Sequence, residues 1–181
     1  MVIRVRPHSN EELSVNDFLT YSDREIRLGR NSFAFDRIFS VDSQQQDIFN
    51  QVGIKLVHHS LEGYNSCVFA YGQTGSGKTH TMVGSGDGII QRSIEQLFLR
   101  VNAAAASNDY SIPCSYFDLY NEPLVDLLDQ SPKTLIVRAD VNKGVFVDGL
   151  WEEPVENVLM AVGLLNQGIR NRHIGETQMN R

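Results

Sequence analysis

The chain has 181 residues, of which 41% are hydrophobic and 21% charged, with a formal net charge of −6; this is the composition of one ordinary globular domain, not of a disordered or fibrous chain. The acidic balance disfavours nucleic acid as a partner, because domains that bind it usually carry a basic surface. No apolar run approaches the ~20 residues of a membrane helix. Two arginines near the start argue against a signal peptide, and two cysteines suit a reducing compartment. We therefore expect a soluble intracellular chain without membrane insertion.

The first elements in chain order are predicted strands. Residues 2–6 alternate apolar and basic side chains, the period of a half-buried strand, and Pro7 ends the pattern. Residues 18–39 hold short apolar runs separated by turn residues, which predicts small antiparallel strands. A helix follows, because apolar residues recur at helical spacing between an N-cap at residues 42–43 and a terminating glycine, Gly63.

Strands and helices alternate along the rest of the chain. The unbroken apolar run at residues 67–70 predicts a strand covered on both faces. The helix after it is interrupted at residues 84–88 and resumes with an apolar stripe. Residues 110–120 and 145–147 predict further strands, and Pro154 stands where the first turn of the last helix accepts proline. This alternation predicts an α/β fold with a central, mostly parallel or mixed sheet flanked by helices.

A glycine-rich segment lies between the predicted buried strand and its helix. Its residues are Gly72, Gln73, Thr74, Gly75, Ser76, Gly77, Lys78 and Thr79, a full match to the phosphate-loop pattern of Gly, four free positions, then Gly-Lys-Ser/Thr. Glycines permit backbone conformations closed to other residues, so that amide groups turn inward as an anion nest. Lys78 is predicted to reach the β- and γ-phosphates, and the Thr79 hydroxyl to ligate Mg²⁺. The sequence therefore predicts a nucleoside triphosphate site.

The amino-acid sequence around this loop closely resembles the kinesin motor domain, and so do several other segments that occur in the same order. The matching segments are Arg4-Val5-Arg6-Pro7, Phe35-Asp36-Arg37-Ile38-Phe39, residues 69–82, Gly88-Ile89-Ile90 with Arg92, residues 115–122, Asp126-Leu127-Leu128, residues 143–147 and Asn171-Arg172. The resemblance implies a P-loop NTPase-like fold, ATP or ADP with Mg²⁺ as ligands, and microtubules as the partner. It also implies a dimeric intact protein located in the cytoplasm on the microtubule cytoskeleton.

The resemblance implies roles for individual residues as well. Those similar to the family's nucleotide contacts are Arg4, Arg6, Pro7 and His80 on the adenine side, and Gly72, Gln73, Thr74, Gly75, Ser76, Gly77, Lys78 and Thr79 at the phosphates and Mg²⁺. Arg172 is similar to the arginine that tethers the nucleotide-sensing switches. The residues themselves also allow Arg4 and Arg6 to be surface residues of an edge strand and Arg172 to be a cation at a helix end.

The resemblance covers the amino-terminal half of the family's domain, residues 1–181. Residues 179–180 resemble the start of the first switch, so we expect both switches, the microtubule-binding elements and the neck to be absent. We accordingly expect these 181 residues alone neither to hydrolyse ATP nor to support movement, because the switches position the attacking water. Departures from the family pattern at Gln91, Asp118, Trp151 and residues 175–176 indicate a divergent member.

Alternative interpretations come from other classes of protein. One is a non-motor nucleotide-binding or structural protein that retains a kinesin-like half domain, and another is an unrelated P-loop NTPase acting on a small molecule or nucleic acid. Residues 145–148 also have the form of a strand that ends in an Mg²⁺-coordinating aspartate. His58 and His59 are predicted to lie on a helix surface, and no His/Cys cluster has zinc-site spacing.

Overall fold

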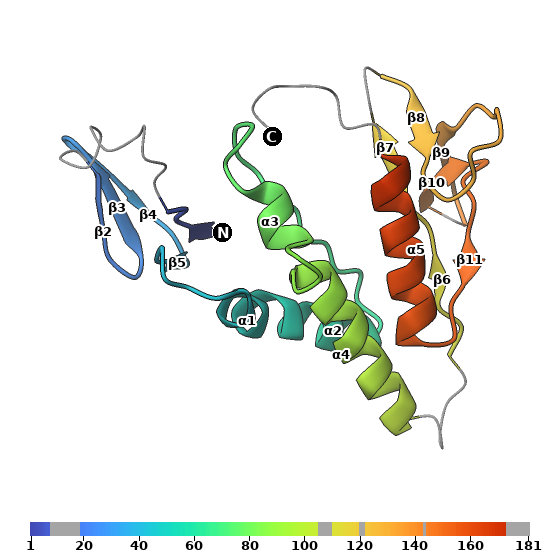
Figure 1. Cartoon of the computed structure of the whole chain (residues 1–181), viewed down its shortest axis with the longest axis horizontal. Coiled ribbons are helices and arrows are strands. Elements are labelled where there is room, and N and C mark those ends of the chain that lie inside the picture. Colours follow the sequence, from blue (N-terminus) through green and yellow to red (C-terminus); the bar gives the residue numbers. More distant parts are fainter. Residues whose placement is uncertain (8–18, 105–109, 120–121, 143, 173–181) are drawn as a thin grey trace. The chain divides into compact units, whose positions relative to one another are not determined.

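The computed structural model (Figure 1) describes the chain with four internal gaps and without its last residues. The described ranges are 1–7, 19–104, 110–119, 122–142 and 144–172. The predicted start of the first switch at residues 179–180, and the family departures at residues 175–176, lie outside them. The chain divides into two compact units, Met1–Ser93 and Ile94–Arg181.

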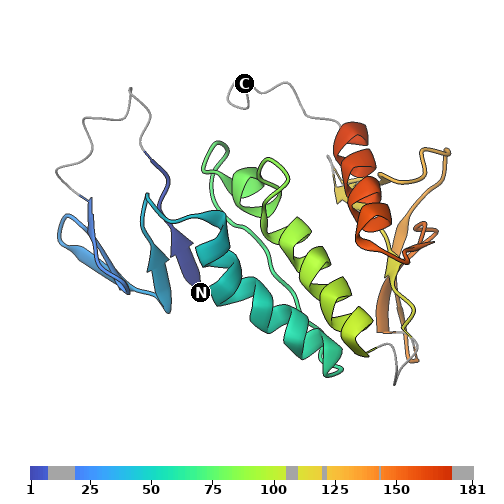
Figure 2. The same cartoon turned by 60° about the horizontal axis from the view of Figure 1, so that its bottom comes forward.

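The first unit begins with strands, as the alternation of the sequence predicts. β1 (Val2–Arg4) pairs in parallel with β5 (Arg37–Phe39), while β2 (Leu19–Tyr21), β3 (Glu25–Leu28) and β4 (Asn31–Ala34) form an antiparallel sheet. The parallel pair matters most for the site, because it fixes the position of Arg4 at the end of β1. Figure 2 shows the chain running from β5 through a short connection into the first helix.

One helical run follows β5. It consists of α1 (Gln45–Ile48), a π-helical turn (Phe49–Gly53) and α2 (Ile54–Leu61). The N-cap predicted at residues 42–43 is wrong by one position: the cap is Gln44, whose backbone N–H donates to the Asp47 carboxylate at 2.8 Å. That contact ties the Gln44 backbone to the first helical turn.

The predicted strand at residues 67–70 is wrong for the described part of the chain. These residues form no strand, and the apolar side chains of Phe69 and Tyr71 are 81% and 94% exposed. A strand needs backbone hydrogen-bond partners along its edges, and no described strand pairs with this segment. The composition of the run is that of a buried strand, but its conformation depends on partners that the local pattern does not supply.

The interrupted helix is confirmed. α3 (Lys78–Met82) and α4 (Ile89–Ala104) are separated by turns at residues 83–88. The core of the first unit lies at the start of α4, where Phe39, Ile48 and Ile89 are buried and pack with Met82. This core joins β5, α1, α3 and α4, and it therefore holds the phosphate-loop helix against the β1–β5 pair.

The second unit contains three antiparallel strand pairs and a helix. The pairs are β6 (Pro113–Cys114) with β11 (Glu153–Pro154), β7 (Phe117–Leu119) with β8 (Leu124–Asp126), and β9 (Ile136–Asp140) with β10 (Gly144–Asp148). The strand predicted at residues 110–120 is thus split in two, since its halves pair with different partners. The strand at residues 145–147 is confirmed within β10.

The last helix is α5 (Val158–Asn171), which Figures 1 and 2 show alongside the strands of its own unit. The placement of Pro154 in its first turn is wrong, because Pro154 belongs to β11. The N-cap is Asn157, whose side-chain oxygen accepts a hydrogen bond from the Met160 backbone N–H at 3.0 Å. Phe98, Val155 and Ala161 form the buried core of this unit.

The fold class is α/β, with both parallel and antiparallel pairing, as predicted. Among the described residues the strands do not form one continuous sheet but separate small sheets of two or three strands. The β2–β3–β4, β7–β8 and β9–β10 sheets pair strands that follow one another along the chain, whereas β1–β5 and β6–β11 join strands that are distant in sequence.

Candidate nucleotide-binding site

The glycine-rich loop at residues 72–79 leads directly into α3. Gly77 caps this helix with φ of 94°, in the left-handed region that favours glycine. Gly72 leaves no room for a side chain, since a Cβ there would lie 2.5 Å from the Ser76 hydroxyl oxygen. The backbone N–H of Ser76 donates to the Gln73 carbonyl at 3.1 Å, which closes the loop on itself. The sequence pattern therefore folds as the tight turn that phosphate recognition requires.

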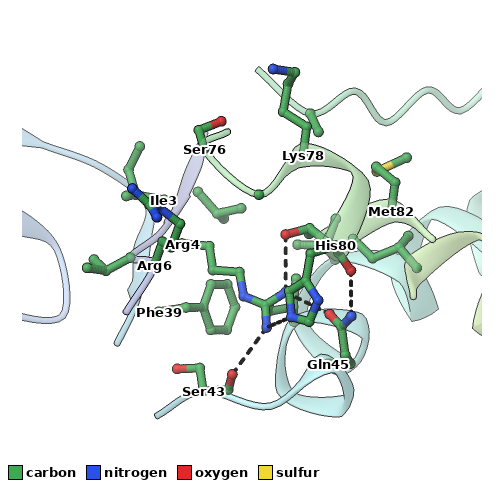
Figure 3. A pocket seen from close by; sticks show the side chains of 18 of the residues that line it. Ile3, Arg4, Arg6, Phe39, Ser43, Gln45, Ser76, Lys78, His80 and Met82 are labelled. Carbon is green, nitrogen blue, oxygen red and sulfur yellow. Dashed lines mark hydrogen bonds between the residues drawn. The ribbon is translucent and has the colours of Figure 1, made fainter. Parts of the chain in front are cut away.

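Lys78 lies across this loop. Its ammonium donates to the carbonyl oxygens of Gly72 at 2.8 Å and Gln73 at 3.0 Å. Figure 3 shows its side chain pointing away from the Arg4 side of the pocket. Phosphate oxygens carry more charge than carbonyl oxygens and form stronger hydrogen bonds with an ammonium. The ammonium of Lys78 is thus held by the carbonyl groups of the loop itself. Thr79, the predicted Mg²⁺ ligand, is exposed on the first turn of α3.

Arg4 is the centre of a hydrogen-bond network on the other side of the pocket. Its Nη1 donates to Gln45 Oε1 at 2.7 Å and to the Thr81 hydroxyl at 3.1 Å. Its Nη2 donates to the Ser43 carbonyl at 3.4 Å and lies 3.5 Å from His80 Nε2. Figure 3 shows Ser43, Gln45 and His80 around the guanidinium of Arg4: Gln45 lies on α1, His80 on α3 and Ser43 just before α1. The half-buried side chain of Arg4 therefore connects β1 to α1 and α3.

The environment of Arg4 also affects its ionisation. Partial burial lowers the pKa of the guanidinium, and the carboxylate of Asp87 opposes this shift. Because the ordinary arginine pKa is far above neutrality, the side chain keeps its charge. The network thus contains one permanent cation that only donates hydrogen bonds, so each partner must offer an oxygen or a nitrogen lone pair.

The structure brings most of the predicted nucleotide contacts to one cavity of about 650 Å³ in the first unit. Its lining includes the predicted contacts Arg4, Arg6, Pro7, Ser76, Gly77, Lys78 and His80, together with Gln45. The loop residues Gly72, Gln73, Thr74, Gly75 and Thr79 do not line it. The volume is within the ~300–1,000 Å³ typical of small-molecule sites. The two predicted halves of the site, base side and phosphate side, therefore meet at the same cavity.

Sequence reasoning missed Gln45, Ser43 and Thr81. Gln45 is buried at 7% exposure, and it stands three residues before the buried Ile48 on the same helix face. A polar residue on an apolar stripe was the available signal, because buried polar side chains are normally hydrogen-bonded. Ser43 contributes through its backbone carbonyl, which no side-chain pattern indicates.

Other predicted residues lie away from the loop in sequence and have local partners. Arg172 is the C-cap of α5, and its Nε donates to Asp118 at 3.3 Å. Asp148 accepts a hydrogen bond from Arg138 at 2.6 Å across the β9–β10 hairpin. In α2, His58 and His59 are exposed as predicted.

No helix in the described part of the chain is both long and apolar enough to cross a membrane. Within the same residues, no three His, Cys, Asp or Glu side chains gather where they would hold a metal ion. A phosphate-bound Mg²⁺ needs no such cluster, since a loop hydroxyl and the phosphates supply ligands.

An α/β fold with a Gly-x-x-x-x-Gly-Lys-Thr loop opening a helix defines a P-loop nucleotide-binding protein. The comparison with known families makes the assignment specific. A family model described as kinesin motor domain matches residues 4–181. The chain belongs to the kinesin motor domain family.

Similar proteins come from plants and animals. Kinesin-like protein KIN-12D of Arabidopsis thaliana is 38% identical over all of this chain, and Centromere-associated protein E of Homo sapiens is 37% identical over 98% of it. The solved structure of a fast kinesin matches 99% of this chain with a TM-score of 0.88 and 34% identity. The chain spans 55% of that solved chain and 7% of the length of each of the two relatives.

Proposed function

We propose that this chain is the ATP-binding portion of a kinesin-like motor and that it holds Mg·ATP or Mg·ADP at the Gly72–Thr79 loop. The observation that carries the proposal is the position of Lys78. Its ammonium is held by the loop carbonyls, and Lys78 lines the same cavity as Arg6, Pro7 and His80. A loop closed by glycines, a lysine beside it and a hydroxyl on the next residue together fit a triphosphate with its cation.

Each half of the site has a distinct task in this proposal. Lys78 stabilises phosphate charge, and the Thr79 hydroxyl supplies one ligand to Mg²⁺, which when bound neutralises charge on the phosphates. On the base side, the Pro7 ring and the His80 imidazole offer flat surfaces for adenine, and Arg6 lies on the same exposed end of the strand. Arg4 contributes through His80 and Gln45, to which its guanidinium is bound or adjacent.

At the level of the whole protein we propose a microtubule-dependent ATPase that couples hydrolysis to movement along microtubules. Support comes from family membership and from the likeness to the fast kinesin, a protein whose structure has been related to its ATPase mechanism and its interactions with microtubules. The proposal places the protein in the cytoplasm on the cytoskeleton, as a dimer. Nucleotide-dependent rearrangement of switch segments is the general way in which such enzymes turn phosphate chemistry into a binding change.

Replacing Lys78 by alanine tests the assignment of the phosphate side. The change removes a charge-assisted contact to the phosphates, so we expect affinity for Mg·ATP to fall by ~10- to 100-fold. Isothermal titration calorimetry measures the difference in the full-length protein. Lys55→Ala is the matched control, because Lys55 is an exposed lysine on α2 outside the cavity. Equal affinity in Lys78→Ala and wild-type protein would contradict the proposal.

A further inference from the structure

Gln45 joins three segments of the first unit that are far apart in sequence. Its side-chain oxygen accepts from Arg4 on β1 at 2.7 Å, and its amide nitrogen donates to the His80 carbonyl on α3 at 2.6 Å. The side chain is buried, and Figure 3 shows its amide close to both the Arg4 guanidinium and His80. Gly84 closes another side, since a Cβ at that position would lie 2.7 Å from Gln45 Nε2.

The chemistry of the two partners requires this residue type. A guanidinium only donates and a backbone carbonyl only accepts, so the bridging group must offer an acceptor and a donor at once. A primary amide does this in a single orientation, with its oxygen toward Arg4. A glutamate at this position would offer acceptors to both partners, and a methionine of similar length would offer neither contact. Gln45 therefore fixes the relative position of Arg4 and the backbone at His80.

We propose that Gln45, which lines the same cavity, is a positioning residue for the base side of the nucleotide site: it sets the affinity for the base by holding Arg4 and the backbone at His80. This inference rests on the proposed function. The phosphate side does not depend on Gln45, because the partners of Lys78 in the described part of the chain are the carbonyls of Gly72 and Gln73. Loss of Gln45 should consequently weaken binding of ligands that carry a base and spare ligands that consist of phosphates only.

The test compares Mg·ADP with Mg·tripolyphosphate, which has no base. In Gln45→Met we expect the Kd for Mg·ADP to rise ~10-fold, since two buried hydrogen bonds that hold the base side are lost. The Kd for Mg·tripolyphosphate should stay within about twofold, because the phosphate loop is unchanged. Gln46→Met is the matched control: Gln46 is the neighbouring exposed glutamine, bound to Arg92 and Asn50, and both Kd values should remain those of the wild type.

A second variant covers the case in which Gln45→Met does not fold. Gln45→Glu keeps an acceptor for Arg4 but places a carboxylate oxygen against the His80 carbonyl, so its Kd for Mg·ADP should also rise. Base-selective weakening in either folded variant supports the proposal. Unchanged Mg·ADP affinity in both, or equal loss for both ligands, overturns it. Wild-type protein that binds neither ligand would instead refute the proposed nucleotide site itself.

Discussion

Asp126 is a buried carboxylate at the end of β8, and its replacement tests how a single charge organises the second unit. Its side chain is 2% exposed. One oxygen accepts from the backbone N–H groups of Leu128 at 2.9 Å and Asp129 at 3.0 Å. The other accepts from the Trp151 N–H at 2.8 Å and the Lys133 ammonium at 2.9 Å. The carboxylate therefore ties the loop after β8 to the segment that precedes β11.

Asp126→Asn changes this site without leaving a cavity, because the two side chains have the same shape. The asparagine oxygen can keep the contacts to Leu128 and Asp129, but its NH₂ group then faces the donors of Trp151 and Lys133. Two hydrogen bonds to a charged group are lost, each contributing ~1.5–3 kcal/mol. We expect the free energy of unfolding to fall by about 3–5 kcal/mol, the usual cost of removing one partner of a buried ion pair.

Urea denaturation of the full-length protein measures this effect as a lower midpoint with an unchanged m-value. Hydrogen exchange of the Leu128, Asp129 and Trp151 amides locates it, since these amides lose their acceptor or its charge. Glu156→Gln is the control: it removes one charge from an exposed residue of the same unit, and surface changes usually stay within ~0.5 kcal/mol. If Asp126→Asn destabilises no more than this control, the four contacts do not carry the stability assigned to them.

Two further predictions concern the same unit. The pKa of Asp129 is lowered from 3.8 to about 2, chiefly by the hydrogen bond from Lys133 and then by those from Ser131. The contribution of Asp129 to stability is therefore present above about pH 4 and is lost as the pH falls toward 2. The urea midpoint should accordingly be lower at pH 3 than at pH 5. Gly168→Ala on α5 should destabilise by about 1–3 kcal/mol, because its Cβ would lie 2.0 Å from the Tyr116 ring. Gly163→Ala, on the same helix with open space around it, should instead stabilise by up to ~1 kcal/mol in thermal unfolding.

The parts of the fold that could be predicted are those determined by neighbouring residues. The interruption between α3 and α4 follows from three glycines in five residues, and the small antiparallel strands follow from short apolar runs with turns between them. Residues 67–70 fail for the opposite reason. Their apolar run specifies a buried strand, but burial and pairing depend on other strands, and no described strand hydrogen-bonds to them.

Pro154 shows how a local rule can be correct and still misplaced. Proline fits the first turn of a helix. Here Pro154 lies instead in the short strand β11, where it pairs with Pro113. The cap of α5 is Asn157 three residues later, and its bond to the Met160 N–H decides where the helix begins. Asparagine is among the preferred N-cap residues, so the correct signal was present but competed with the proline.

The candidate site also has one part that depends on neighbouring residues and one part that depends on residues distant in sequence. Its proposed phosphate side is a run of eight consecutive residues, so a local sequence pattern was enough to predict it. Its base side is assembled from β1, α1 and α3. The side chain of Gln45 hydrogen-bonds to Arg4, 41 positions earlier in the chain, and to the His80 carbonyl, 35 positions later. No local pattern encodes such a bridge. Substitutions in the phosphate loop should therefore act on the phosphates directly, while substitutions at Gln45 should act on the base side, through the positions of Arg4 and His80. A ligand without a base separates these two classes of effect, because it uses the first group of contacts and not the second.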